Sequence, residues 1–196
     1  MTEPAYTRLE NDERRRLLLE LGADLFTRHA YDEISMAQIA REAGISKALL
    51  YHYFPSKQDY FVATLSSGAE DLRRRVEPDP DLPPAEALMA AVDAYLGWIE
   101  DNAKAYEKLL QSAATVPEVR ELVEDVRAAT VERILEGVGA TGPAARTAVR
   151  GWLWFMDGAC LDWIAHRDLD RAQLLGLLLG TLFGALMAAG VKLPTG

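Results

Sequence analysis

The fold of this chain is decided by thirteen consecutive residues, Ile45-Ser46-Lys47-Ala48-Leu49-Leu50-Tyr51-His52-Tyr53-Phe54-Pro55-Ser56-Lys57. They follow a short helical pattern that ends at Gly44, a residue that readily takes the left-handed turn at a helix end. Ser46 is a favourable N-cap, so a second short helix is expected to begin there. At helical spacing, Leu50, Tyr53 and Phe54 fall on the packed side of this second helix.

Two short helices that meet at a glycine form the core of a helix-turn-helix. The first helix would begin at Ser35-Met36-Ala37-Gln38, which is typical of a capping box, with Ile39 and Ala40 facing inward. The second would enter the major groove of DNA, where every base pair shows a distinct pattern of donors and acceptors. A lysine at its start can donate to guanine, a small alanine allows close approach, and a leucine can touch a thymine methyl group.

This stretch and its flanks resemble the TetR/AcrR family of bacterial repressors. The resemblance is carried by Phe26, Ser35-Met36-Ala37-Gln38-Ile39-Ala40-Arg41-Glu42-Ala43-Gly44-Ile45-Ser46-Lys47, Leu50-Tyr51, Phe54-Pro55-Ser56-Lys57 and Asp59. These pieces match the spacing of the family motif without gaps. The rest of the chain resembles the family only in its length and its all-helical character.

The resemblance implies a role in DNA binding for a small set of residues. Base-reading positions are occupied by Lys47, Ala48 and Leu49, and phosphate-contact or helix-start positions by Ser35, Ser46, Tyr51, His52 and Lys57. The family commonly has a glycine near Ala48 and a small or hydroxyl residue at Leu49, so the operator sequence cannot be borrowed from a relative. Tyr60 stands where an aliphatic residue is usual, and we expect this difference to be harmless.

The remainder of the chain follows the helical period, and no alternating run is long enough to predict a strand. Helices are expected at about 11–30, 56–76, 84–102, 104–113, 117–138, 143–166 and 170–190, which makes about nine in total. Four prolines between Pro78 and Pro84 mark a break. The sequence therefore predicts an all-α protein, with a three-helix DNA-binding domain at 1–60 and a larger helical ligand-binding and dimerisation domain at 61–196.

The middle helices are rich in large aromatic residues, and the resemblance implies an effector cavity among them. The candidate lining residues are Tyr95, Trp98, Tyr106, Trp152, Phe155 and Met156, with Gln111 and Asp157 as polar anchors. Plain core packing explains each of these residues equally well, since periodicity alone does not separate a core from a cavity wall. A wide aromatic cavity would suit a flat or lipophilic small molecule.

The last helical stretch allows two interpretations. Residues 174–191 carry no charge and place glycine at every fourth position, which is typical of a membrane helix or of a helix buried in a bundle. The resemblance implies a homodimer formed by the last two helices, and the apolar face of 143–166 favours that interpretation over a membrane anchor. The expected interface residues are Val149, Leu153, Cys160, Ile164, Gly176, Gly180, Phe183, Gly184 and Met187.

Composition limits the other classes of function. One cysteine excludes an internal disulfide, three scattered histidines form no metal motif, and no nucleophile–base pair or phosphate loop is present. We therefore expect no enzyme, cofactor or metal. The first twenty residues contain five acidic side chains, unlike a signal peptide, which predicts a cytoplasmic location. The formal net charge of −9 lies mostly beyond residue 60, away from the part predicted to meet DNA.

These expectations combine into one function: a ligand-responsive repressor that binds a palindromic operator as a homodimer. A dimer is needed because one helix-turn-helix contacts few bases, whereas two on a twofold axis read successive major-groove faces. The family mechanism implies that an effector favours a shape in which the 56–76 helix swings. This swing would change the spacing of the two helix-turn-helix units of the dimer, called the reading heads below.

Overall fold

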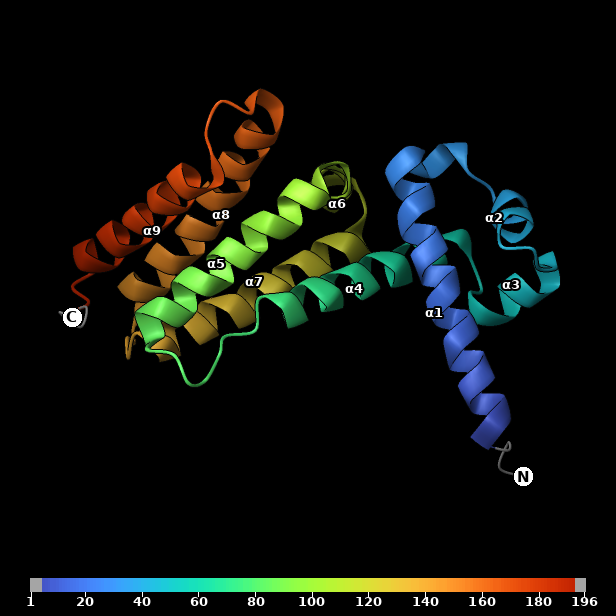
Figure 1. Cartoon of the computed structure of the whole chain (residues 1–196), viewed down its shortest axis with the longest axis horizontal. Helices are drawn as coiled ribbons and strands as arrows, with labels where there is room; N and C mark the ends of the chain where they lie inside the picture. Colours follow the sequence, from blue (N-terminus) through green and yellow to red (C-terminus); the bar gives the residue numbers. More distant parts are fainter. Residues whose placement is uncertain (1–4, 193–196) are drawn as a thin grey trace. The chain divides into compact units, whose positions relative to one another are not determined.

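The computed structural model describes residues 5–192, with side chains described from residue 11 onward. Within this range the chain is all-helical and has no strand, which confirms the predicted fold class. The chain divides into two compact units, Met1–Asp71 and Leu72–Gly196, and each is described here by itself. Both are shown in Figure 1, where the colours run along the sequence from blue to red.

The first unit is a small helical bundle that ends within its last helix. Its elements are α1 (Ala5–Arg28), the 3-10 helix η1 (Tyr31–Glu33), α2 (Met36–Glu42), α3 (Lys47–Tyr53) and the start of α4 (Lys57–Arg75). Short α2 and α3 pack on each other beside the long α1 (Figure 1). The apolar core comes from the four α-helices and from the residues that follow η1 and α3, and it includes Leu18, Leu25, Phe26, Ile34, Ile39, Leu50, Phe54 and Phe61.

The second unit is a bundle of five helices. They are α5 (Pro84–Asp101), α6 (Ala103–Thr115), α7 (Pro117–Gly137), α8 (Pro143–His166) and α9 (Arg171–Ala188). The pairs α8–α9, α6–α7, α7–α8 and α5–α9 pack side by side (Figure 1). All five lie within two residues of the predicted bounds at both ends. The core is built mainly from α5, α8 and α9.

Local sequence signals explain why these helices begin where they do. Proline occupies the first position of α5, α7 and α8, where its missing N–H leaves no bond unmade and its fixed φ suits a helix. Gly142, just before α8, has a backbone φ of 100°, which residues other than glycine rarely adopt. Asp170 caps α9 and forms a capping box with Gln173.

The boundary between the two units differs from the predicted one. The first unit extends through Asp71, whereas the sequence suggested a division after Tyr60. Tyr60, Phe61 and Thr64 are all buried, so the first two turns of α4 belong to the core of the first unit. The helix then continues through the division without a break.

Candidate nucleic-acid interface

Two serine caps fix the starts of α2 and α3. The Ser35 hydroxyl accepts from the Gln38 backbone N–H at 3.3 Å, and the Ser35 N–H donates to the Gln38 side chain at 2.8 Å, as the capping box predicted. Between the helices, Gly44 has a φ of 65°, in the left-handed region. The Ser46 hydroxyl then accepts from the Leu49 N–H at 3.1 Å. The two helices and the turn between them form a helix-turn-helix.

Helix α3 has a buried side and an exposed side. Leu50 and Phe54 are 0% and 2% exposed, so they hold the helix against the core. Lys47, Ala48, Tyr51 and His52 are exposed, and Leu49 is half-buried. The Lys47 ammonium lies 5.6 Å from the centre of the Tyr51 ring. The outward face therefore presents a cation, a small residue, an imidazole and a phenol.

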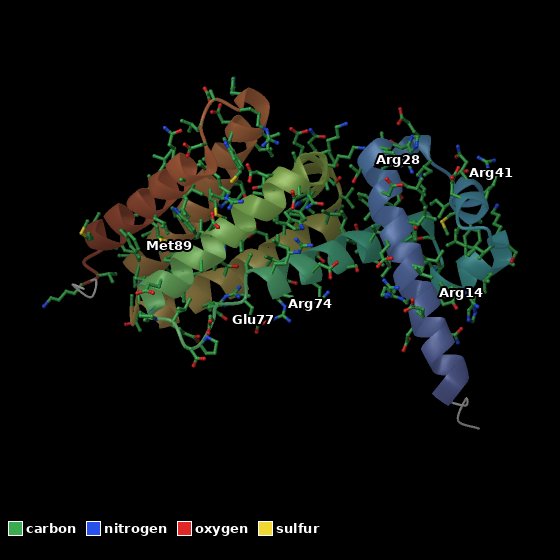
Figure 2. All side chains as sticks on the ribbon, viewed as in Figure 1. Arg14, Arg28, Arg41, Arg74, Glu77 and Met89 are labelled. Atoms are coloured by element: carbon green, nitrogen blue, oxygen red, sulfur yellow. The ribbon has the colours of Figure 1, made fainter. Side chains whose placement is uncertain are left out.

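Tyr53 connects α3 to α1, although the sequence suggested a simple core residue. Its side chain is half-buried, and its hydroxyl donates to the Asn11 side chain at 2.9 Å. The Arg14 guanidinium donates to the same hydroxyl at 3.4 Å, so this basic side chain is held beside α3 (Figure 2). The hydroxyl fixes the end of α3 relative to α1.

Lys57 makes contacts that the sequence did not reveal. Its Nζ donates to the backbone oxygens of Tyr31 and Ile34, at 2.9 and 3.2 Å, and lies 4.1 Å from the centre of the Tyr31 ring. These bonds tie the start of α4 to the segment between α1 and α2. An ammonium has three donors, so one remains for another acceptor.

The sequence of the chain matches known families in two places. Residues 18–64 match the bacterial regulatory proteins of the tetR family, and residues 84–185 match the tetracyclin repressor-like C-terminal domain. The chain belongs to the TetR family. TetR-family proteins are transcriptional regulators that bind DNA through a helix-turn-helix and are not enzymes, which confirms both predictions.

Individual relatives agree with this assignment. The HTH-type transcriptional activator FasR of Mycolicibacterium smegmatis is 30% identical over 66% of this chain, and the match spans 60% of that relative's length. A TetR-family regulator from Streptomyces coelicolor is 30% identical, with a TM-score of 0.79 over 91% of this chain and 82% of that one. A regulator from Saccharomonospora viridis in complex with choline shares the fold at 20% identity, with a TM-score of 0.72 over 88% of this chain and 96% of that one.

In this TetR-family protein, three of the expected effector residues meet in a polar cluster. The Tyr106 hydroxyl donates to the Asp157 carboxylate at 2.8 Å, and the Tyr95 hydroxyl donates to the Tyr106 oxygen at 3.1 Å. Burial raises the pKa of both phenols well above the ordinary value, so they remain protonated donors. The cluster links α5, α6 and α8.

Arg127 completes this cluster, although no sequence pattern predicted its role. From α7, its guanidinium donates to Asp157 at 2.5 Å and to Glu124 at 2.7 Å. It also lies 4.2 Å from the centre of the Trp154 ring, within the range of a cation–π contact. Arg127 is one of many charged residues in α7 and lies 30 positions before its carboxylate partner, so no local pattern distinguishes it.

The other expected effector residues lie in different environments. Gln111 and Phe155 lie at the surface, and their part in an effector site stays a prediction. Trp152 and Met156 are buried in the core, and the Trp152 indole N–H donates to the Leu178 backbone oxygen at 2.8 Å. Trp98 is half-buried and packs against the same core.

The expected dimer residues also divide into two groups. Val149, Leu153 and Cys160 are only 0%, 3% and 0% exposed, so they pack within the protomer and cannot reach a partner. For α8, the helical periodicity of the sequence thus led us to expect dimer contacts from residues that lie on the inward face. The others lie at or near the surface: Gly176, Gly180, Gly184 and Met187 are exposed, while Ile164 and Phe183 are half-buried.

Helix α9 is long and apolar enough to cross a membrane by length and composition alone, with a mean hydropathy of 1.5. A core helix of a globular protein meets the same criterion. Its leucines 174, 178, 182 and 186 are at most 1% exposed and pack against α5 and α8, which explains the apolar sequence without a membrane. The membrane interpretation is therefore not favoured.

Proposed function

We propose that this protein is a homodimeric cytoplasmic repressor that binds a palindromic operator through α3 and is released by a small apolar or aromatic effector. The observation that supports DNA reading most directly is the outward face of α3. Lys47, Ala48 and Leu49 lie in its first turn, next to the Ser46 cap. Leu50 is buried and packs the helix against the core of the first unit. In a helix-turn-helix, the first residues of the second helix contact the base edges.

The remaining exposed groups suit the phosphate backbone. Tyr51 and His52 follow the base-reading positions on the same exposed face of α3. Ser35 lies at the start of α2, where the positive end of the helix favours an anion. A helix clamped by phosphate contacts on both sides would be held in one register on the duplex.

Selection of bound DNA from a random pool tests this proposal. We expect the wild-type protein to enrich a palindrome. Lys47→Ala should relax the base preference at one position per half-site, at a cost of about 1–3 kcal/mol. Tyr51→Phe should weaken binding to all sequences alike. Lys104→Ala, which removes an exposed lysine of α6, is the matched control and should change neither property. Failure to enrich any sequence would refute the proposal.

The proposed dimer surface is the outward side of α9 together with the exposed part of α8. On α9, the exposed glycines 176, 180 and 184 lie among the exposed side chains of Leu177 and Met187, which are 47% and 61% exposed. A Cβ built on any of these glycines would meet nothing within 4 Å in the protomer. The protomer's own packing therefore does not require them, whereas a partner helix could approach closely along such a stripe.

Leu177→Asp tests the dimer surface because it places a charge in the middle of this face. We expect a monomer in sedimentation velocity and loss of palindrome binding with the helical content unchanged. Ala128→Asp adds the same charge to an exposed position of α7 and should remain dimeric. A dimeric Leu177→Asp variant would locate the interface elsewhere.

The effector site is proposed at the Tyr95–Tyr106–Asp157 cluster because it gathers polar anchors among aromatic side chains, as ligand sites generally do. Thermal shift measurements with indole, octanoate and choline separate three chemical classes of effector. We expect indole or octanoate to raise the Tm and to release the selected DNA, with choline inactive. Stabilisation by choline alone would instead indicate a cationic effector.

The sign of regulation needs its own measurement, because the FasR relative is named an activator. A reporter placed behind the selected palindrome should be expressed less when the wild-type protein is present. Tyr51→Ala should restore expression. Higher expression with the wild-type protein would identify an activator.

A further inference from the structure

Tyr60 makes a directional contact deep in the first unit. It lies in the first turn of α4 and is fully buried, and its hydroxyl donates to the backbone oxygen of Leu18 in α1 at 2.5 Å. Burying a phenol hydroxyl costs free energy unless it finds such an acceptor. An apolar ring could slide along α1, but this bond fixes one position of α4 on α1. Tyrosine at position 60, which we expected to be a harmless replacement of an aliphatic residue, therefore makes a specific contact between α4 and α1.

Gly22 allows this contact by leaving space where the two helices cross. A Cβ at this position would lie 2.5 Å from Thr64 Oγ1 and 2.8 Å from the Tyr60 hydroxyl oxygen. Both distances are shorter than real Cβ contacts. The Thr64 hydroxyl is itself held, because it donates to the Tyr60 backbone oxygen at 2.8 Å. We call Gly22, Tyr60 and Thr64 the α1–α4 crossing.

The same tyrosine also contacts the end of the recognition helix. Its ring packs edge-on against Phe54, with centroids 4.8 Å apart, and Phe54 is the C-cap residue of α3. On the other side the ring lies 5.7 Å from that of Phe26 in α1. A shift of α4 at Tyr60 would therefore displace α3 as well as α1, because all of these side chains are buried and close-packed.

Helix α4 is also the covalent path out of the first unit. It runs from Lys57 to Arg75 as one helix, and the division between the units falls within it, after Asp71. No flexible loop separates the reading unit from the rest of the chain at that point. The α1–α4 crossing therefore lies at the start of the helix that carries the chain out of the first unit.

We propose that Tyr60 and Gly22 are positioning residues for operator binding: they fix the angle of α4 on α1 and so set the spacing of the two recognition helices in a dimer. This inference rests on the proposed function, because it needs a dimer and a palindrome. A single head bound to one half-site does not depend on that spacing. A palindrome does, since both heads must fit major-groove faces one helical turn apart.

The experiment compares two duplexes, the selected palindrome and the same DNA with one half-site scrambled. Wild-type protein should bind the palindrome more tightly; equal binding of the two duplexes by the wild type would refute the proposed function and, with it, this inference. Given that preference, Tyr60→Phe should weaken palindrome binding by about tenfold, the scale of one lost hydrogen bond, and change half-site binding by less than about twofold. Equal losses on both duplexes, or no loss on either, would overturn the inference.

A steric series provides a second, independent measurement. Gly22→Ala should lower the ratio of palindrome to half-site affinity further than Tyr60→Phe does. In a Tyr60→Leu/Thr64→Ala background, which removes the Thr64 Oγ1 and the Tyr60 hydroxyl oxygen and Cζ that the new Cβ would meet, Gly22→Ala should have much less effect. Gly68→Ala is the matched control, because that α4 glycine has open space around it. Helical content and Tm are recorded for every variant, and a Gly22→Ala loss that persists in the relieved background would contradict the proposed crossing.

Discussion

The Nζ of Lys57 lies 2.9 Å from the backbone oxygen of Tyr31 and 4.1 Å from the centre of the same residue's ring. One side chain at the start of α4 therefore closes the loop between α1 and α2 by a hydrogen bond and by a cation–π contact. The sequence suggested only a phosphate contact for Lys57. Its two backbone bonds leave one N–H free, so the residue can both hold the loop and meet a phosphate.

Lys57→Met should separate these two tasks. Loss of hydrogen bonds from a charged donor should lower the free energy of unfolding by about 1–3 kcal/mol in a urea titration. Loss of the phosphate contact should reduce the slope of log affinity against log salt by about 0.9 per lysine, roughly 2 for a dimer. Lys47→Met, the control on α3, should leave stability unchanged. A stability loss with an unaltered salt slope would confine Lys57 to folding.

Asp157→Asn should destabilise the second unit by about 3 kcal/mol, because it removes one partner of an ion pair whose side chains are only 12% and 16% exposed. Replacing both partners, as in Arg127→Met/Asp157→Asn, should recover most of this loss. Urea unfolding of the two variants and the wild type measures the difference. A double variant as unstable as Asp157→Asn would contradict a pairwise origin of the effect.

Glu124 should contribute a pH-dependent part of the stability. Its hydrogen bond and ion pair with Arg127, aided by Arg150, hold the pKa of its carboxyl below the ordinary value of 4.5. A lowered pKa in the folded state stabilises the fold above pH 4.5, and this contribution disappears as the pH falls through the lowered value. Wild type should exceed Glu124→Gln in stability at pH 7, and the difference should vanish in acid. A constant difference at every pH would exclude this cause.

Cys160 should be inert in the folded protein. It is completely buried, and burial together with the nearby Asp157 carboxylate raises the pKa of its thiol to about 12. At pH 8 its thiolate fraction should be on the order of a thousandfold below that of a free cysteine. Ellman's reagent should therefore label one thiol only after denaturant is added. Rapid labelling of the native protein would show that α8 opens readily.

The sequence predicted local structure well and distant contacts poorly. Capping serines, helix-starting prolines and Gly44 act on neighbouring residues, so the helix bounds and the two faces of α3 could be predicted from them. Lys57, Tyr60 and Arg127 act on partners 23 to 42 residues away, and no local pattern announces those contacts. Only the folded chain brings such groups together.

The inward and outward faces of α8 and α9 show a different limit. Both helices are apolar around much of their circumference, so periodicity does not decide which side meets the core. For α9 the glycine stripe marked the outer side, because the buried positions are all leucine. For α8, periodicity alone pointed to Val149, Leu153 and Cys160, which are buried inside the protomer. A helix with two apolar sides needs a structure, or a small-residue stripe, before its faces can be assigned.

The unbroken passage of α4 through the division between the units has a consequence for building chimaeric regulators. A splice after residue 60 would leave Tyr60 with α1 and α3 but replace Phe61 and Thr64, the next buried residues of α4, which belong to the same core. The mostly exposed turn at 76–83, after α4 ends, leaves that packing intact. A transplanted reading unit should therefore carry its entire fourth helix and join its new host at this turn.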